Sequence, residues 1–379
     1  MKRMIAMLLV LMMACSCVIP TAALESYGTV IDPASGEEHP ILPSVEDIIP
    51  DNLDELAAAG AVAEEENQVT VDESISEDVQ TETAASDLND LADVYDTSEV
   101  VEVDLSSCRI LVSANDEEAI ITEDAVIAEL DGLYLLQFED EADAKLAYMY
   151  YNDLADYADV DIPVMIAEGE EVRAIEDMDI VPVEMDEESN PFTEVQTVID
   201  EIQQSDDKTT ADQPVIALID TGVSSDIEAD RYSVMGGEGV DGNGHGTRMA
   251  EIIREICPEA KLLSIQATND EGVGSASSLY AAIQLAIELQ ADVINLSLYG
   301  VRSEQNRTLE TVIRSAVDVG ITVVGAAGNS GRDASGYIPG SMENVVVAGS
   351  VDEDGTLAAF SNYGESVDYY VVSGSTSEA

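Results

Sequence analysis

The sequence predicts an α/β protein whose main domain is a doubly wound parallel sheet, preceded by a smaller α+β unit. From residue 214 onward, strand-like and helix-like segments alternate. The strand-like segments are apolar runs without polar alternation, which is typical of strands covered by helices on both faces. Upstream, between residues 105 and 170, several strand patterns surround one helix pattern, and this order is typical of a mixed α+β unit.

The first 23 residues have the pattern of a signal peptide. The basic pair Lys2-Arg3 precedes ten apolar or small residues from Ile5 to Ala14, and Thr21-Ala22-Ala23 offers small residues for cleavage. This run is too short to anchor a chain across a bilayer, and no second run of about 18 apolar residues follows, so we expect export without a transmembrane segment. The expected location is secreted or at the cell surface. The stretch Ala14-Cys15-Ser16-Cys17 also resembles a weak lipoprotein cleavage site, so a lipid anchor is the alternative to free secretion.

The chain is strongly acidic, and this charge argues against several classes of partner. It has 79 Asp and Glu residues against 14 Lys and Arg residues, a formal net charge of -65. Such a charge repels nucleic acid and anionic lipid at long range, so binding to nucleic acid is not expected. Solubility, or a high-salt or acid-adapted habitat, explains the acidity better than recognition of a basic partner does.

Residues 24–104 form an acidic segment with few aromatic residues. Neighbouring carboxylates such as those of Glu64-Glu65-Glu66 repel one another, and the short apolar stretches offer too little surface for a core. We therefore expect this segment to be extended or disordered.

The α+β unit covers residues 105–170. Strand patterns occur at 108–112, 124–130, 133–138 and 160–166, and a helix pattern at 141–152. The dipeptide Asp131-Gly132 between two strand patterns predicts a tight hairpin turn. Residues 171–213, which are acidic and contain proline, are expected to be a linker open to proteolysis.

The main domain covers residues 214–379. Strand patterns occur at 215–219, 261–267, 293–298 and 321–326, and helix patterns at 247–256, 275–289 and 309–319. In such sheets, ligands lie beyond the carboxyl ends of the strands. Asp220 and Asn329 lie just past two of these ends, where functional residues are expected.

Three short segments carry side chains suited to nucleophilic catalysis. Asp220 follows an apolar strand, His245 stands between two glycines, and Asn329 follows a glycine-rich strand end. An aspartate can orient a histidine, the histidine can take a proton from a serine, and an asparagine can donate a hydrogen bond to the developing oxyanion. Taken alone, Asp220 would be an ordinary turn-capping residue and His245 an ordinary surface histidine. Their occurrence together in this order points to a serine protease.

These segments resemble those of the subtilisin-like serine proteases, the subtilases of peptidase family S8. The resemblance runs from about residue 214 to the end of the chain and includes Asp292–Leu298, Asn344–Val351 and Ala359–Gly364. It implies a subtilisin-like fold and a serine-type endopeptidase. By the resemblance, Asp220 orients His245, His245 acts as general base and then as general acid, and Asn329 stabilises the tetrahedral oxyanion.

The resemblance also indicates which residues contact a peptide substrate. We expect the peptide to bind by strand addition beside an exposed edge. The residues that match the site for the side chain before the scissile bond are Ser297, Leu298, Gly325, Ala326, Ala327 and Gly328. Where the family usually has glycine, this chain has Tyr299, whose ring either narrows the cleft and contacts the substrate or turns outward.

The resemblance assigns the nucleophile to Ser377. Thr376, Ser377 and Ala379 fit the family pattern, but Ser375 replaces a glycine and the stretch after Gly364 is shorter than usual. We therefore expect a chain that is cut short at its C-terminus, with Ser377 as the nucleophile after a loop deletion. The alternative is that the serine lies beyond this sequence.

The four cysteines and two histidines argue against a disulfide framework and a zinc site. Removal of residues 1–23 would leave Cys108 and Cys257, which fall in different predicted units. No His or Cys cluster has zinc-ligand spacing, so no metal or other cofactor is expected in the chemistry. Family members often bind structural calcium, for which the acidic turn Asp352-Glu353-Asp354-Gly355 offers oxygen ligands.

The unit at 105–170 resembles, more loosely, the inhibitory pro-domains that precede such proteases. The resemblance implies an intramolecular inhibitor that fills the cleft and is later cut away, whereas an unrelated accessory domain is the alternative. The sequence as a whole predicts an exported serine endopeptidase that cleaves polypeptides through an acyl-enzyme. The alternatives are a catalytically inactive relative that serves as a binding module, or an inactive fragment of a protease.

Overall fold

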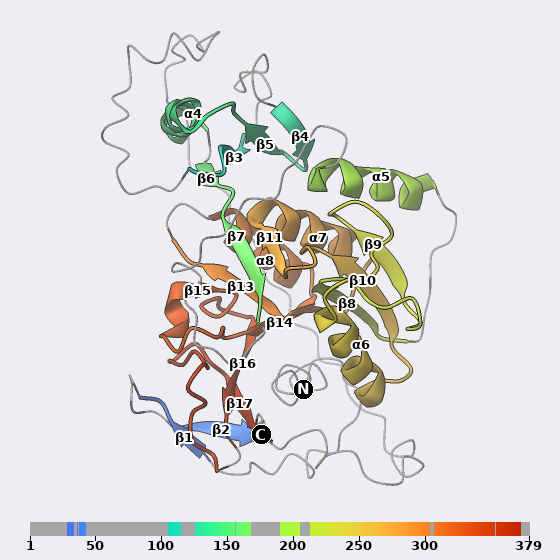
Figure 1. Cartoon of the computed structure of the whole chain (residues 1–379), viewed down its shortest axis with the longest axis vertical. Helices are drawn as coiled ribbons and strands as arrows, with labels where there is room; N and C mark the ends of the chain where they lie inside the picture. Colours follow the sequence, from blue (N-terminus) through green and yellow to red (C-terminus); the bar gives the residue numbers. More distant parts are fainter. Residues whose placement is uncertain are drawn as a thin grey trace, which may run out of the picture.

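The computed structural model describes residues 29–33, 36, 38–42, 105–114, 126–155, 157–167, 190–204, 213–303, 307–352 and 354–372. The predicted signal peptide, most of the acidic segment, parts of the linker and Ser377 lie outside these residues. One nine-stranded and two four-stranded sheets organise the described chain (Figure 1).

The nine-stranded sheet forms the main domain. Its strand order is β1-β2-β17-β16-β14-β12-β8-β10-β9, and all neighbours except β1 and β2 are parallel. The strands of the main domain are β8 (Val215–Asp220), β9 (Asp230–Ser233), β10 (Lys261–Gln266), β12 (Val293–Leu296), β14 (Thr322–Ala326), β16 (Val346–Val351) and β17 (Tyr369–Val372). The two added at the edge are β1 (Thr29–Ile31) and β2 (Glu38–Leu42).

Helices cover both faces of this sheet. Ile216 and Leu218 of β8 belong to a buried cluster with α6 (His245–Ile256), whereas Ala217 and Ile219 belong to one with α7 (Ala276–Glu288) and α8 (Arg307–Asp318). Successive side chains of a strand point to opposite faces, so the two clusters lie on opposite sides of the sheet. The predicted doubly wound α/β fold is confirmed, and burial on both faces explains the apolar strand runs.

The predicted helices of the main domain match the observed ones to within two residues at each end. A capping box starts α7: the Ser275 hydroxyl accepts from the Ser278 N–H at 3.2 Å, and the Ser278 hydroxyl accepts from the Ser275 N–H at 2.9 Å. The strand predicted at 293–298 divides at Ser297. Its first part is β12, and its second part starts β13 (Leu298–Val301), which belongs to another sheet.

The small α+β unit has an antiparallel sheet with the order β4-β5-β3-β6. Its elements are β3 (Arg109–Ser113), β4 (Val126–Leu130), β5 (Leu133–Gln137), α4 (Glu141–Leu154) and β6 (Tyr157–Val160). One face, including Ile110 and Leu136, packs with the helix α4. The other face, including Leu111 and Leu135, joins the core of the main domain. The unit is therefore docked through its sheet.

The next strand, β7 (Pro163–Ile166), leaves the small unit and enters a third sheet. This sheet has the order β11-β7-β13-β15, with β11 (Val273–Ser275) and β15 (Tyr337–Ile338) contributed by the main domain. β7 pairs antiparallel with β11 on one side and β13 on the other. Figure 1 shows β7 running down from the small unit alongside β13. The single strand expected at 160–166 is thus two strands, β6 and β7, in different sheets.

The hairpin of β1 and β2 is a difference from the prediction that residues 24–104 are extended or disordered. β2 pairs in parallel with β17, with Ile41 opposite Tyr370. The His39 ring meets the Tyr370 ring edge-on at 5.7 Å between centroids. A short segment that cannot form its own core can still be ordered by an existing sheet edge, because the edge supplies backbone partners and an apolar surface.

A helix also interrupts the predicted linker. The helix α5 (Pro191–Gln204) is capped by Asn190, whose side-chain oxygen accepts from the N–H groups of Phe192 at 3.1 Å and Thr193 at 3.0 Å. Phe192 is fully buried and its ring lies 5.7 Å from that of Tyr280 on α7. This contact attaches part of the linker to the main domain.

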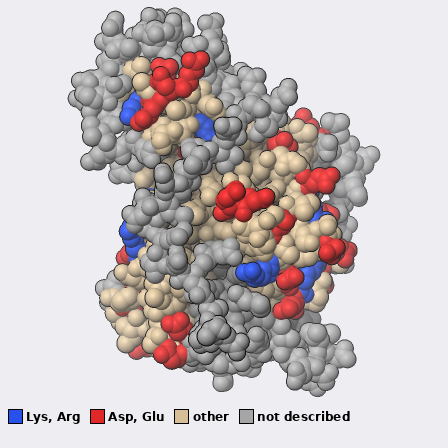
Figure 2. Space-filling view, viewed as in Figure 1, with Lys and Arg blue, Asp and Glu red and all other residues tan. Residues whose placement is uncertain are grey.

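Charged side chains and cysteines are distributed over both the small unit and the main domain. On the face seen in Figure 2, acidic side chains lie over both the small unit and the main domain, with basic ones beside them in several places. Cys108 is partly exposed, whereas Cys257 is buried and its thiol donates to Glu259 Oε1 at 3.6 Å. Among the residues whose placement is described, no helix has the length and apolar character needed to cross a membrane.

Candidate active site

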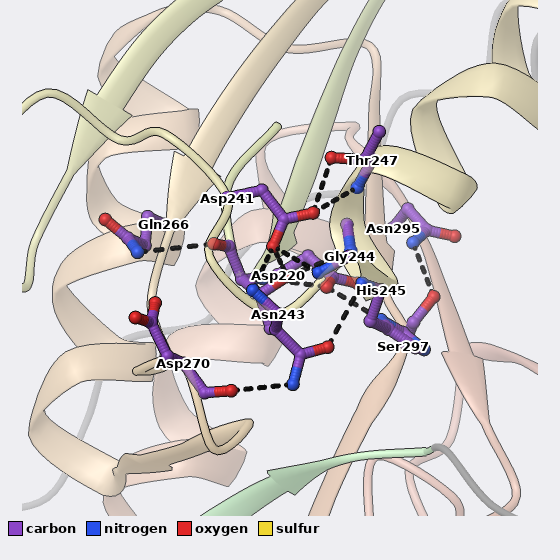
Figure 3. A network of polar contacts seen from close by, with 12 residues as sticks. Asp220, Asp241, Asn243, Gly244, His245, Thr247, Gln266, Asp270, Asn295 and Ser297 are labelled. Carbon is purple, nitrogen blue, oxygen red and sulfur yellow. Dashed lines mark hydrogen bonds and ion pairs between the residues drawn. The ribbon is translucent and has the colours of Figure 1, made fainter. Parts of the chain in front are cut away.

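Asp220 and His245 form a buried pair at the carboxyl end of β8, an inner strand of the main sheet. Asp220 is the last residue of β8 and His245 the first residue of α6. The His245 Nδ1 lies 2.7 Å from Asp220 Oδ1, and neither side chain is more than 1% exposed (Figure 3). The same oxygen accepts the Thr221 N–H at 2.7 Å. With Nδ1 facing the carboxylate, the other ring nitrogen of His245 is directed away from Asp220.

The glycine after His245 permits this close approach. A Cβ on Gly246 would lie 2.1 Å from the carbonyl oxygen of Gly222, so no larger residue fits without moving the backbone. The Gly246 N–H donates to the Thr221 hydroxyl at 2.9 Å. The start of α6 is thereby held against the end of β8, which brings the two catalytic candidates together.

Asp241 organises the loop before His245, and sequence analysis did not single it out. Its Oδ1 accepts the N–H groups of Asn243 at 2.9 Å and Gly244 at 2.8 Å, and the Thr221 hydroxyl at 2.9 Å. Its Oδ2 accepts both the N–H and the hydroxyl of Thr247. Figure 3 shows these bonds converging on one carboxylate. The available sequence signal was an Asp just before a helix start, a common capping pattern.

These bonds determine the protonation of Asp241. Burial alone would raise the pKa of the carboxyl, but the bonds from Gly244, Thr247 and Thr221 favour the ionised form and hold its pKa below the ordinary value of 3.8. Asp241 therefore remains a carboxylate acceptor at neutral pH.

Asn329 lies near the same end of the main sheet. The strands β8, β12 and β14 are parallel neighbours, with Leu296 opposite both Ile219 and Gly325. Neighbouring strands lie about 4.8 Å apart, so the end of β14 is about 10 Å from Asp220. Asn329 follows β14 by three residues and is half-buried. The sheet thus places Asp220, His245 and Asn329 on the side of the sheet where the parallel strands β8, β12 and β14 end.

Asn362 holds the loop that carries Asn329, and it is a second residue that sequence analysis missed. Its side-chain oxygen accepts the N–H groups of Ser330 and Arg332, each at 3.0 Å, and its Nδ2 donates to the Ala327 carbonyl at 2.8 Å. Asn362 is fully buried. Its segment was noted in the family resemblance, but the 32 positions that separate it from Ser330 leave no local signal of the contact.

Tyr299 turns inward, which decides between the two alternatives left by the sequence. Its side chain is only 4% exposed. Its ring meets that of Tyr337 at 5.9 Å and 68°. Met165 of β7 and Ala167, just past the end of β7, pack against the cluster that these two tyrosines form. The tyrosine therefore lies in the groove where β7 is bound.

Of the remaining predicted substrate-site residues, two contact or pair with the β7 segment and four lie at the end of β14 or just after it. The Ser297 carbonyl accepts the Ala167 N–H at 2.8 Å, so this residue does contact the strand. Leu298 pairs with Ile166 through the backbone, with its own side chain buried. The other members, Gly325, Ala326, Ala327 and Gly328, are buried at the end of β14 and just after it.

Two predictions stay untested. Ser377 lies outside the described residues, so its distance from His245 is not defined. In the part of the chain that the structure covers, no group of three or more His, Cys, Asp or Glu residues is placed to hold a metal ion. In the acidic turn proposed for calcium, Asp354 Oδ1 accepts the Thr356 N–H at 3.0 Å and its hydroxyl at 2.6 Å, and calcium binding there stays a prediction.

Fold and site together define a class of protein. A doubly wound α/β domain that carries a buried Asp–His pair and an asparagine loop at the carboxyl ends of strands in one sheet has the architecture of a subtilisin-type serine protease. The sequence profile of the Subtilase family (Peptidase_S8) matches residues 211–373, so this part of the chain is similar to that family.

Three similar proteins illustrate the relationship. Subtilisin-like protease 2 of Pseudogymnoascus destructans is 36% identical over 144 residues, covering 36% of this chain and 35% of that protein. M-protease of Shouchella clausii is 29% identical over 285 residues, covering 69% and 71%. Minor extracellular protease Epr of Bacillus subtilis is 32% identical over 171 residues, covering 41% and 26%.

The extent of these matches differs. The chain spans about a third of the length of Subtilisin-like protease 2. The M-protease match covers 69% of this chain, more than residues 211–373 make up, so it reaches residues before 211. Similarity to that protein therefore extends beyond the part that the family profile covers.

Proposed function

We propose that this chain is a serine endopeptidase that cleaves polypeptides through an acyl-enzyme. The observation that carries the proposal is the buried Asp220–His245 contact of 2.7 Å on a subtilase fold. Asp220 keeps the imidazole in the tautomer with the proton on Nδ1 and stabilises the imidazolium that forms during the reaction.

Each step then has an assigned group. The serine hydroxyl, assigned to Ser377, attacks the peptide carbonyl while His245 Nε2 takes its proton, which forms the new C–O bond and an oxyanion. The Asn329 amide donates to that oxyanion. His245 returns the proton to the departing amine, and a water molecule then releases the acyl group by the same two proton transfers.

A fluorophosphonate probe tests this proposal on the full-length chain. We expect labelling of the wild-type protein, and loss of labelling in His245→Ala and in Ser377→Ala. Labelling that persists in Ser377→Ala shows that another serine is the nucleophile. Because a bound small unit would shield the cleft, labelling is also measured after this unit has been removed by limited proteolysis. If the correctly folded main domain is still not labelled, the second candidate function, a catalytically inactive relative that uses the cleft for binding, replaces the first.

We also propose that the small α+β unit is an intramolecular inhibitor that fills the cleft. β7 is bound as a peptide substrate would be, between two strands of the main domain: the Ile166 N–H donates to the Gly272 carbonyl at 3.0 Å and the Ala167 N–H to the Ser297 carbonyl at 2.8 Å. This is strand addition on both edges of one short segment. An accessory domain with another role would not need to occupy this groove.

Two buried carboxylates of the small unit support the same proposal. The Asp161 carboxylate accepts the N–H of Ser277 at 2.8 Å and its hydroxyl at 3.0 Å, in the first turn of α7. The Asp159 carboxylate accepts the N–H and hydroxyl of Thr308, at the start of α8. Each acid thus caps a helix of the main domain, where unpaired N–H groups and the helix dipole favour a negative charge.

The bound strand also indicates the bond that self-cleavage would cut. Ala167 is the residue whose N–H reaches the carbonyl of Ser297, next to the end of β12. Ser297 follows Leu296, which lies opposite Ile219, the neighbour of Asp220. We therefore assign the maturation cut to the Ala167–Glu168 bond. N-terminal sequencing of the processed protein should begin at Glu168, and His245→Ala should stay uncut; a different start would contradict the assignment.

Export rests on the N-terminal sequence and on the name of one relative, Minor extracellular protease Epr. We propose that residues 1–23 direct secretion, with lipid attachment at Cys15 or Cys17 as the alternative. Metabolic labelling with palmitate separates the two outcomes. A label that is lost in the Cys15→Ser/Cys17→Ser double variant would favour the lipid anchor.

A further inference from the structure

We propose that Tyr299 restricts the substrate residue before the cleaved bond to the size of alanine. The substrates are then peptides with a very small residue before the cleaved bond and with apolar residues one and three positions before that small residue. This inference rests on the proposed protease function and names its substrate class. It starts from the position of Ala167 and from what surrounds it.

Ala167 marks the position before the cleaved bond. It follows β7, which pairs with β13 so that Ile166 lies opposite Leu298 and Met165 opposite Tyr299. The Ala167 N–H donates to the Ser297 carbonyl, at the point where the chain passes from β12 into β13. A substrate that repeated this pairing would place its corresponding side chain where the Ala167 methyl lies.

The cluster of Tyr299 and Tyr337 borders that methyl. Ala167 and Met165 pack against the cluster formed by Tyr299 and Tyr337, whose rings meet edge-on at 5.9 Å, and Ala167 also packs against a second cluster that contains Ala326. The Tyr299 Cδ2 would lie only 3.5 Å from a Cβ placed on Gly328. The ring therefore reaches from β13 to the loop after β14. These are the two segments that sequence analysis assigned to the pocket for the side chain before the scissile bond.

A larger side chain at this position would have to displace the ring. Tyr299 is 4% and Tyr337 2% exposed, so neither ring can move into open solvent without losing buried contacts. Forcing extra atoms into a filled site is unfavourable, and pocket size alone discriminates side chains by about 10- to 200-fold. Alanine fits because it adds only a methyl group.

Two glycines shape the rest of the groove. A Cβ on Gly272 would lie 2.6 Å from Ile166 Cδ1, and a Cβ on Gly300 would lie 3.2 Å from Val164 Cγ1. Val164 is fully buried and Ile166 is 7% exposed. The groove is therefore open to branched apolar side chains at these two positions, and closed beside Tyr299.

The test uses self-processing of the full-length chain, followed by mass spectrometry. We expect Ala167→Phe to slow cutting of the 167–168 bond by about 100-fold, and Tyr299→Gly to restore it in the double variant to within about tenfold of wild type. Tyr299→Phe keeps the ring, so its double variant with Ala167→Phe should remain blocked. Wild-type rates in Ala167→Phe alone, or equal rescue by Tyr299→Phe and Tyr299→Gly, would overturn the inference.

A second measurement does not need catalysis. In the uncut His245→Ala protein, hydrogen exchange reports how firmly β7 is bound. Ala167→Phe should speed exchange of the β7 amides, and Tyr299→Gly should slow it again in the double variant. Unchanged exchange in Ala167→Phe would refute the role of Tyr299. If exchange changes as expected but no variant with an intact active site is processed, the protease function is refuted and the role of Tyr299 is not.

Discussion

At the scale of single residues, the residues that organise the site are distinct from those expected to perform the chemistry. Asp220 and His245 form the expected pair, but Asp241 arranges the loop that presents His245, and Asn362 holds the loop that presents Asn329. Both are buried or half-buried polar side chains whose partners are mainly backbone groups. Such residues act by limiting the positions that the catalytic groups can adopt.

Asp241 gives a pH-dependent prediction. Because its pKa is lowered in the folded protein, its carboxylate stabilises the fold above the ordinary pKa of 3.8, and this contribution is lost as the pH falls through the lowered value. We expect Asp241→Asn to lower the free energy of unfolding by about 1 to 3 kcal/mol at pH 7. The difference between the two proteins should shrink below pH 3.8, measured by urea unfolding. A difference that stays constant from pH 7 to pH 3 would contradict this account.

Asn362 gives a prediction about turnover. Asn362→Ala removes two accepted hydrogen bonds and one donated bond from the Asn329 loop, so we expect kcat to fall by at least about tenfold with little change in KM. Asn362→Asp keeps an oxygen acceptor for Ser330 and Arg332 but loses the bond to Ala327, and should be intermediate. A rise in KM with kcat unchanged would show that the residue supports substrate binding instead.

At the scale of secondary-structure elements, contacts between elements decide more than the elements themselves. The predicted helices occur almost where the apolar periodicity placed them, but the helices α7 and α8 receive their caps partly from the small unit. Among the strands that the structure describes, β7 pairs with β11 and β13 of the main domain. The small unit is therefore docked through several contacts at once: one face of its sheet, the strand β7 and two carboxylates that cap helices of the main domain.

The cap at α7 can be tested by substitution. Asp161 is 2% exposed, and its carboxylate also lies 3.3 Å from the Arg109 Nε. Loss of this carboxylate therefore leaves both the start of α7 and a buried guanidinium without their acidic partner. We expect Asp161→Ala to speed hydrogen exchange in the first turn of α7 by at least tenfold in the uncut His245→Ala background. Glu139→Ala, an exposed acid of the same unit, is the matched control. Equal exchange in both variants would count against the capping role.

At the scale of the whole molecule, the chain before residue 168 touches the main domain at two distant places. The small unit and β7 bind at the groove beside β13, whereas the β1–β2 hairpin extends the main sheet at β17 (Figure 1). Two attachments on one chain make the second contact intramolecular, which can raise overall affinity by about 10²- to 10⁴-fold without new contacts. A single cut after Ala167 would leave both attachments in place.

This arrangement predicts that the cut N-terminal fragment stays bound. Ile41 is 4% exposed and pairs with Tyr370, so Ile41→Asp should weaken the hairpin contact specifically. After processing, we expect the wild-type fragment to co-elute with the main domain in gel filtration. As the protein is diluted, the Ile41→Asp fragment should separate from the main domain at a protein concentration at least tenfold higher than the wild-type fragment does. Ile31→Asp, on an exposed position of the same hairpin, is the control. Identical elution of Ile41→Asp and wild type would show that the hairpin does not contribute.

The sequence by itself determined the parallel sheet, the helices around it and the positions of Asp220, His245 and Asn329. These features depend on local patterns: apolar runs of strand length, helical periodicity, and glycines next to a functional side chain. They can be recognised within a few residues, because a strand that is buried on both faces of a sheet has apolar residues at consecutive positions.

Only the tertiary structure decided the contacts between distant segments. Asp161 meets Ser277 across 116 positions of the chain, and the partners of β2 and β7 lie in other units. No periodicity encodes such contacts, since they depend on which surfaces remain to be covered once the local elements have formed. For the same reason, the inward turn of Tyr299 could not be read from the chain, because it follows from the packing of Tyr337 and β7 around it.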